Sequence, residues 1–101
     1  MSKIKREEVY NLLRRIPLGR ISTYKIIANY LGVKSYRGVA RIIANNPDAP
    51  NTPCHRVVKN NGEISGYALG VDKKIHLLKQ EGVEVIAGRI KNFSDLLFFF
   101  D

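Results

Sequence analysis

The sequence predicts a single, mainly α-helical domain with a small β-hairpin. Apolar side chains recur at helical spacing in three consecutive N-terminal segments and again in a fourth segment that ends at Gly82. A short β-branched segment with an asparagine-glycine turn lies between them. A chain of 101 residues can bury one hydrophobic core but not two, so we expect residues 1–101 to form one domain.

The first predicted helix covers residues 5–16 and stops at the Pro17-Leu18-Gly19 sequence. Its apolar positions follow helical spacing and should face the core. They are Val9, Leu12, Leu13 and Ile16.

The next two predicted helices are short and joined by a tight turn. Ser22 or Thr23 can cap the second helix, and Gly32 is placed to end it. Ser35 can cap the third helix, which should stop at residues 45–47. The spacing predicts three residues of this helix facing inward and three facing largely outward: Val39, Ile42 and Ile43, and Tyr36, Arg37 and Arg41, respectively. The pattern is typical of a helix-turn-helix, and two packed core helices would explain it equally well.

The remaining elements follow a proline-containing loop. Val57-Val58, a turn at residues 60–62 and Glu63-Ile64 predict the hairpin. Residues 66–70 read as a loop, after which Asp72 can cap a last helix that runs through Glu81. A short strand is predicted at residues 83–86, and the apolar tail, residues 93–100, should fold over the core or form a partner interface.

Composition narrows the classes of function. Seventeen Lys and Arg residues against nine Asp and Glu give a net charge of +8, which favours phosphate-rich partners but also suits a solvated basic surface. No apolar run approaches the roughly 20 residues needed to cross a bilayer. Neither a leader nor a second cysteine is present, so we expect the protein in the reducing cytoplasm and not at a membrane. We also expect a monomer that associates with the nucleoid.

The single cysteine, Cys54, lies in the sequence Pro53-Cys54-His55-Arg56-Val57-Val58. Thiolate is the reactive form of cysteine, and neighbouring cations and a general base would raise its fraction. A buried structural cysteine is the alternative, since free cysteine is among the most buried residue types. The adjacent histidine and arginine favour a reactive thiol.

These motifs together resemble the DNA-binding and active-site domain of the O6-alkylguanine-DNA alkyltransferases, also called methylated-DNA–protein-cysteine methyltransferases. The hexapeptide at Cys54 is intact, and Asn46-Pro47, Gly66-Tyr67 and Leu77-Leu78 through Glu81-Gly82 are in register with it. The resemblance covers about Ile4 to Gly82. It implies a winged helix-turn-helix-like alkyltransferase C-terminal domain.

The resemblance also implies the chemistry: irreversible transfer of an alkyl group from O6 of a flipped guanine to Cys54. His55 would act as general base through a water molecule, and Glu81 would orient it. Asn46 would brace the active-site loop. Without the resemblance, His55 reads as a packed or solvated imidazole and Glu81 as an exposed carboxylate. No cofactor is implied, and Cys54, His55 and His76 do not make a four-ligand metal set.

The partner implied is double-stranded DNA containing O6-alkylguanine. Arg37 would enter the duplex and fill the gap left by the flipped base, and Tyr24 would crowd the phosphate. Other DNA-binding positions expected from the helix-turn-helix are Lys34, Ser35, Tyr36 and Arg41. The expected substrate pocket consists of Tyr24, Val57, Tyr67, Ala68 and Leu69. Leu69 stands where many relatives have glycine or tryptophan, which leaves the width of the pocket open.

The chain starts almost directly at the helix that precedes the helix-turn-helix, whereas the family's usual members carry an additional N-terminal domain. This short architecture is shared with the alkyltransferase-like proteins, which bind alkylated DNA and signal it to excision-repair proteins without repairing it. Those proteins lack the acceptor cysteine, so Cys54 favours a minimal alkyltransferase. A basic transcriptional helix-turn-helix protein is a third reading, and it leaves the sequence around Cys54 unexplained.

Overall fold

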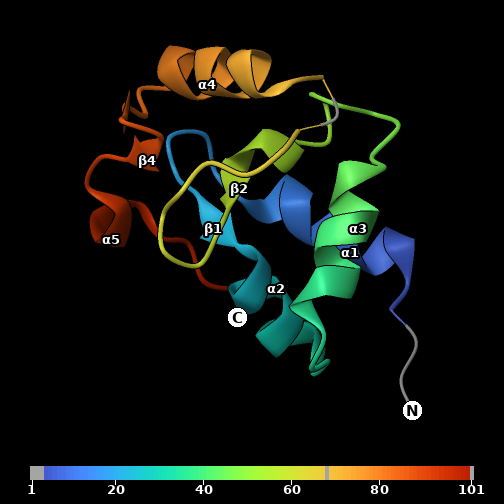
Figure 1. The fold of residues 1–101 in the computed structure, drawn as a ribbon. Coiled ribbons are helices and arrows are strands. Elements are labelled where there is room, and N and C mark those ends of the chain that lie inside the picture. The colour runs from blue at the N-terminus through green and yellow to red at the C-terminus, as the bar shows by residue number, and fades with distance from the viewer. Residues whose placement is uncertain (1–3, 68, 101) are drawn as a thin grey trace.

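The structure is a computed structural model that describes residues 4–67 and 69–100. It is mainly helical, as predicted (Figure 1). Helix α1 (Arg6–Arg15) packs against α3 (Tyr36–Ala44), which in turn packs against α2 (Tyr24–Leu31). No helix in the described part of the chain is long and apolar enough to span a membrane. The main core is formed by buried residues from these helices and from the segment that carries the cysteine: Val9, Leu12, Leu13, Ile16, Ile27, Val39, Ile43, Cys54 and Val57.

The helix-turn-helix is confirmed, and its caps come from local sequence. The Thr23 hydroxyl accepts a hydrogen bond from the Ile26 amide at 3.1 Å, and the Ser35 hydroxyl accepts one from the Gly38 amide at 3.2 Å. Gly32 ends α2 in the left-handed region with φ of 72°, a conformation that costs glycine little because it lacks Cβ. The turn therefore places α3 directly after α2.

The predicted turn at residues 60–62 forms, since the Gly62 amide donates to the Lys59 carbonyl at 2.9 Å and the Lys59 amide donates to the Glu63 carbonyl at 3.0 Å. The predicted pairing of Val57-Val58 with Glu63-Ile64 is wrong. Strand β2 (Val57–Val58) instead pairs in parallel with β1 (Ser22–Thr23), and Glu63 forms an isolated bridge with Arg89. Both valines of β2 are fully buried, which is typical of a strand covered on both faces. The antiparallel hairpin of the structure is formed later, by β3 (Val85–Ile86) and β4 (Arg89–Ile90).

Helix α4 (Val71–Gln80) lies across the domain at the top of Figure 1. It begins after Gly70, and the predicted cap at Asp72 is wrong. Asp72 lies in the first turn, where a carboxylate interacts favourably with the positive end of the helix dipole. The helix ends at Gln80, one residue before the predicted end, with Glu81 as its C-cap, and Gly82 follows with φ of 84°.

The tail packs over the domain and is held by backbone hydrogen bonds. After the short helix α5 (Phe93–Leu96), the Phe98 amide donates to the Ile21 carbonyl at 2.7 Å. The Ile21 amide donates to the Leu96 carbonyl at 3.0 Å, and the Arg20 side chain bonds the same carbonyl at 3.0 Å. The tail thus runs beside the segment that leads into β1 (Figure 1).

We predict that Phe98→Ala lowers the free energy of unfolding by about 2 kcal/mol, because the partly buried ring packs on the main core. Phe99, which is 62% exposed, provides the matched control, and Phe99→Ala should change stability by less than about 0.5 kcal/mol. Urea unfolding measures both. Equal losses from the two substitutions would contradict the packing of the tail.

Candidate active site

Cys54 begins the short 3-10 helix η1 (Cys54–Arg56) and is only 1% exposed. Its amide donates to the Thr52 carbonyl at 2.8 Å. The buried Asn46 side chain bonds the same carbonyl at 2.8 Å, and its own oxygen accepts from the Asp48 amide at 3.0 Å. Asn46 therefore ties the end of α3 to the loop that delivers the cysteine.

Burial raises the pKa of the Cys54 thiol, because a thiolate is poorly solvated in the interior. Hydrogen bonding by Asn46 and the positive charge of Lys74 act in the opposite direction without cancelling the effect. The resting cysteine is thus a neutral thiol at pH 7, and forming the thiolate requires a base. Asn46 and Lys74 can stabilise the thiolate once it forms.

The candidate base, His55, is the next residue in the sequence. The His55 side chain is 2% exposed, and its Nε2 lies 2.8 Å from Glu81 Oε2. Glu81 also forms a two-point pair with Arg56, at 2.8 Å to Nε and 3.0 Å to Nη2. A third hydrogen bond of 2.7 Å joins Arg56 Nη1 to the Ile16 carbonyl. Three elements, α1, η1 and α4, are therefore connected through one arginine and one carboxylate.

These contacts determine the protonation states of His55 and Glu81. Burial acts to raise the pKa of Glu81, but the hydrogen bonds from Arg56 and His55 outweigh it and the pKa is lowered. Burial lowers the pKa of His55, and the nearby Glu81 only partly opposes this. At neutral pH His55 is thus a neutral imidazole that donates from Nε2 to the carboxylate. Its buried Nδ1 has no hydrogen-bond partner among the described residues, so a lone pair is free to accept a proton.

Tyr67 closes another side of the cysteine. Its ring meets His55 edge-on, with centroids 6.2 Å apart. Burial, followed by the proximity of Cys54, raises the pKa of Tyr67 to about 12. The buried Tyr67 hydroxyl has no hydrogen-bond partner among the described residues. It nevertheless lies near the Cys54 thiol and lowers the pKa of that thiol. Tyr67 is thus a neutral hydrogen-bond donor facing the cysteine.

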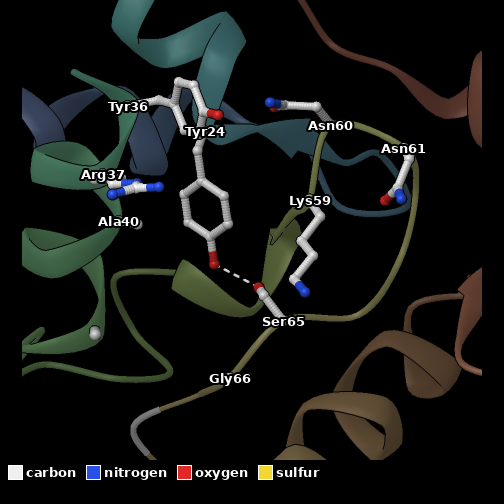
Figure 2. A pocket seen from close by; sticks show the side chains of 10 residues that line it. Tyr24, Tyr36, Arg37, Ala40, Lys59, Asn60, Asn61, Ser65 and Gly66 are labelled. Carbon is white, nitrogen blue, oxygen red and sulfur yellow. Dashed lines mark hydrogen bonds between the residues drawn. The ribbon is translucent and has the colours of Figure 1, made fainter.

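A pocket of about 560 Å³ opens between α3 and the loop after β2 (Figure 2). Tyr24 stands in it, and its hydroxyl is hydrogen-bonded to Ser65. Burial raises the pKa of Tyr24, and the nearby Cys54 adds to this effect. Cys54 itself is not one of the residues that line the pocket. The residues that line the pocket come from α2, α3 and the loop: Tyr24, Tyr36, Arg37, Ala40, Ala44, Lys59, Asn60, Asn61, Ser65 and Gly66.

The predicted DNA-binding residues at the start of α3 and around it lie in different surroundings. Arg37 and Tyr36 line the pocket from the start of α3 (Figure 2). Lys34 is exposed in the turn, and Arg41 is exposed in the last turn of α3. The Ser35 hydroxyl is engaged as the cap of α3.

The predicted pocket wall is only partly present. Tyr24 lines the pocket, but Val57 is fully buried in the core and its side chain does not reach this space. Val57 belongs to the hexapeptide, and it pairs in parallel with Ser22 of β1 and packs in the main core. Tyr67 and Leu69, which is 49% exposed, lie outside the described lining, and Ala68 falls outside the described residues.

Sequence reasoning missed Lys74 and Ser65. Lys74 is 1% exposed, and its ammonium donates to the Val57 carbonyl at 2.7 Å and to Ser65 Oγ at 2.9 Å. A signal was available for Lys74, because it lies four residues before Leu78 on the apolar side of α4. Nothing local distinguishes Ser65. Among residues 4–67 and 69–100, no cluster of acidic, histidine or cysteine side chains could hold a metal ion.

Known proteins are similar to this chain in sequence and in fold. A bifunctional methyltransferase/endonuclease of Picrophilus torridus is 41% identical over 83 residues, which cover 81% of this chain and 28% of that protein. A methylated-DNA–protein-cysteine methyltransferase of Methanosarcina acetivorans is 46% identical over 77 residues, covering 75% of this chain and 49% of that protein. The chain thus spans about half or less of the length of these relatives.

Two solved structures have a similar fold. S. pombe Atl1, in complex with damaged DNA containing O6-carboxymethylguanine, is 29% identical and has a TM-score of 0.79, covering 92% of this chain and 93% of Atl1. Mycobacterium tuberculosis OGT in complex with DNA is 33% identical with a TM-score of 0.74, covering 80% of this chain and 51% of OGT. The family profile described as 6-O-methylguanine DNA methyltransferase, DNA binding domain, matches residues 5–83. The chain therefore belongs to the 6-O-methylguanine DNA methyltransferase family, through its DNA-binding domain.

Proposed function

We propose that the chain repairs O6-alkylguanine in double-stranded cytoplasmic DNA by irreversible transfer of the alkyl group to Cys54. The observation that carries the proposal is the buried Cys54 with the His55 and Glu81 pair next to it. Tyr24, which lines the pocket beside the helix-turn-helix, is near enough to Cys54 for the thiol to affect its pKa. Each chain has one acceptor and accepts one alkyl group. The M. acetivorans relative, named a methylated-DNA–protein-cysteine methyltransferase, supports the same reaction class.

The proposed transfer begins with ionisation of the thiol. His55 Nδ1 takes the proton of Cys54 through a water molecule, and Glu81 stabilises the resulting imidazolium across the 2.8 Å contact. The thiolate attacks the alkyl carbon, the S–C bond forms, and the bond from carbon to O6 breaks with its electron pair on the purine. The thioether that remains has no route back to thiol, so the transfer occurs once per chain.

DNA binding is assigned to the face formed by α3 and the loop after β2. Arg37 and Lys59 supply positive charge on opposite sides of the pocket, where the strand that carries a flipped base would lie (Figure 2). The planar Arg37 guanidinium suits the vacated stack, and Tyr24 suits the rotated phosphate. Two structural neighbours, S. pombe Atl1 and M. tuberculosis OGT, were crystallised with DNA.

A damage sensor is the second candidate. The similarity to S. pombe Atl1 extends over nearly the full length of both chains, which favours this alternative. Such a protein would hold alkylated DNA for excision-repair partners and would have no use for an ionisable acceptor. The Cys54, His55 and Glu81 arrangement is complete here, so we place the transferase first.

Intact-mass measurement separates the two candidates. After incubation with a duplex containing O6-methylguanine, the protein should gain the mass of one methylene group, located at Cys54 by peptide mapping. Cys54→Ser should bind the same duplex with unchanged mass, because the alcohol cannot supply the anion. Tight binding by the wild-type chain without any mass gain would identify the sensor.

Glu81→Gln should lower the pKa of His55 further, because the carboxylate favours the charged imidazolium through a hydrogen bond and through its charge. NMR titration of the imidazole resonances measures this shift. The exposed His76 on α4 is the internal control, and its resonances should be the same in both proteins. An unchanged His55 titration would show that the pair does not act as a unit.

Arg37→Ala should reduce repair in duplex DNA far more than DNA affinity, because an unstacking cost of a few kcal/mol is left uncompensated. A mispaired or extrahelical lesion should partly rescue this variant. Lys34→Ala, which removes an exposed charge in the turn, should instead weaken binding to every duplex and lower the salt slope by about one. Equal losses of repair on paired and unpaired lesions would reduce Arg37 to a backbone contact.

A further inference from the structure

The loop after β2 forms one wall of the pocket, opposite α3 (Figure 2). The residues of this loop that line the pocket are Lys59, Asn60, Asn61, Ser65 and Gly66. Residues 62–64 lie between them in the sequence and are not among the lining residues. They contact the β3–β4 hairpin instead. The wall of the pocket is therefore supported by a separate part of the chain.

Backbone hydrogen bonds join the loop to this hairpin. The Ile64 amide donates to the Gly88 carbonyl at 2.9 Å, and the Ile90 amide donates to the Gly62 carbonyl at 2.9 Å. Residues 62–64 thus lie beside β4 as a third extended segment. An isolated two-stranded hairpin is only marginally stable in water, and a third strand or packing against a helix is needed to stabilise it. The loop and the hairpin therefore depend on each other for a fixed conformation.

The side chain of Phe93 adds to this support. Its ring lies against Gly62, where a Cβ atom would come within 3.0 Å of the ring. A larger residue at position 62 would crowd the ring, so the two fit together closely. Phe93 also packs against the second hydrophobic cluster of the domain, whose buried residues are Ile21, Val58, Leu78, Val83 and Ile90. The ring therefore connects the loop with β2 and α4.

The supporting segment lies beyond the residues that the family profile matches. The profile ends at residue 83, whereas β3, β4 and Phe93 lie within residues 85–93. The loop that lines the pocket lies inside the matched part. The pocket of the DNA-binding domain is thus supported by residues outside the matched domain.

We propose that the β3–β4 hairpin and Phe93 position the loop at residues 59–66, so that the pocket is formed before a lesion enters it. Phe93 is a positioning residue, because it contacts Gly62 and does not line the pocket. The inference rests on the proposed function, in which the pocket receives the flipped base. It concerns the binding of that base and not the chemistry at Cys54.

The physical reason is the entropy of the loop. A flipped base is bound only when the loop adopts one conformation, and ordering a loop during binding lowers the affinity. A loop that the hairpin already holds in place binds without this cost. An undamaged duplex keeps its bases stacked and leaves the pocket empty. Loss of the support should therefore weaken binding of the lesion and leave binding of undamaged DNA unchanged.

Phe93→Ala tests the proposal, because it removes the ring that packs on Gly62. The variant is made in the Cys54→Ser chain, so that affinity is measured without transfer. Affinities are compared for a duplex containing O6-methylguanine and for the same duplex without the lesion. We expect the ratio of the two affinities, the lesion preference, to fall about tenfold. Phe93→Tyr keeps the ring and should restore the lesion preference of the parent.

Two controls separate positioning from a general loss of stability. Phe98→Ala removes another partly buried ring of the tail, which packs on the main core. It should lower stability to a similar extent in urea unfolding and leave the lesion preference unchanged. Arg89→Ala removes the exposed ion pair with Glu63, at 3.8 Å, and keeps the backbone hydrogen bonds. It should match the parent, because exposed ion pairs contribute little.

Phe93→Leu replaces the alanine variant if that variant is unfolded, and it should lower the lesion preference in the same direction. An unchanged lesion preference in the folded Phe93 variant would overturn the inference. An equal loss in Phe93→Ala and Phe98→Ala would do the same and leave the hairpin with a structural role alone.

The proposed transfer is tested separately, by the intact mass of the wild-type chain. A wild-type chain that gains no mass would overturn the transferase reaction and leave the binding result standing. A Cys54→Ser parent without any lesion preference would overturn the binding of a flipped base in the pocket, and the positioning role of the hairpin with it.

Discussion

The carboxylate of Glu81 connects the segments that form the candidate active site. It accepts hydrogen bonds from His55 and from two nitrogens of Arg56, Nε and Nη2. The third nitrogen, Arg56 Nη1, donates to the carbonyl of Ile16, the C-cap of α1. One side chain at the end of α4 thus fixes the orientation of η1 relative to two helices. The position of Cys54 at the start of η1, and the free lone pair of His55, both depend on this arrangement.

The local part of the fold was predictable, and the long-range part was not. Thr23, Gly32 and Ser35 act within a few residues of themselves, so their roles as caps follow from sequence. Val57 and Val58 are buried on both faces of their strand, and they pair with residues 22 and 23, which are distant in the sequence. An asparagine-glycine turn after β2 therefore indicated a hairpin that tertiary packing overrides.

The same division holds for the site. The run at residues 53–58 identified Cys54 and His55 because the two are adjacent, and the resemblance added Glu81. Lys74 and Ser65 come from separate elements and meet only when α4 is laid over β2. A lysine in a helix ordinarily suggests a solvated side chain, and only its alignment with Leu78 on the apolar side of α4 hinted otherwise.

The parallel pairing of β1 with β2 has a kinetic consequence. Contacts within the helix-turn-helix join near neighbours in sequence, whereas this pairing closes a loop of more than 30 residues, and the tail joins Ile21 from still farther away. Contacts between distant segments form more slowly because their loop-closure entropy must be overcome first. Helices α2 and α3 should consequently form earlier than Cys54, His55 and Glu81 are brought together. Under the proposed function, the surface that binds DNA would thus form before the reactive site as the chain folds.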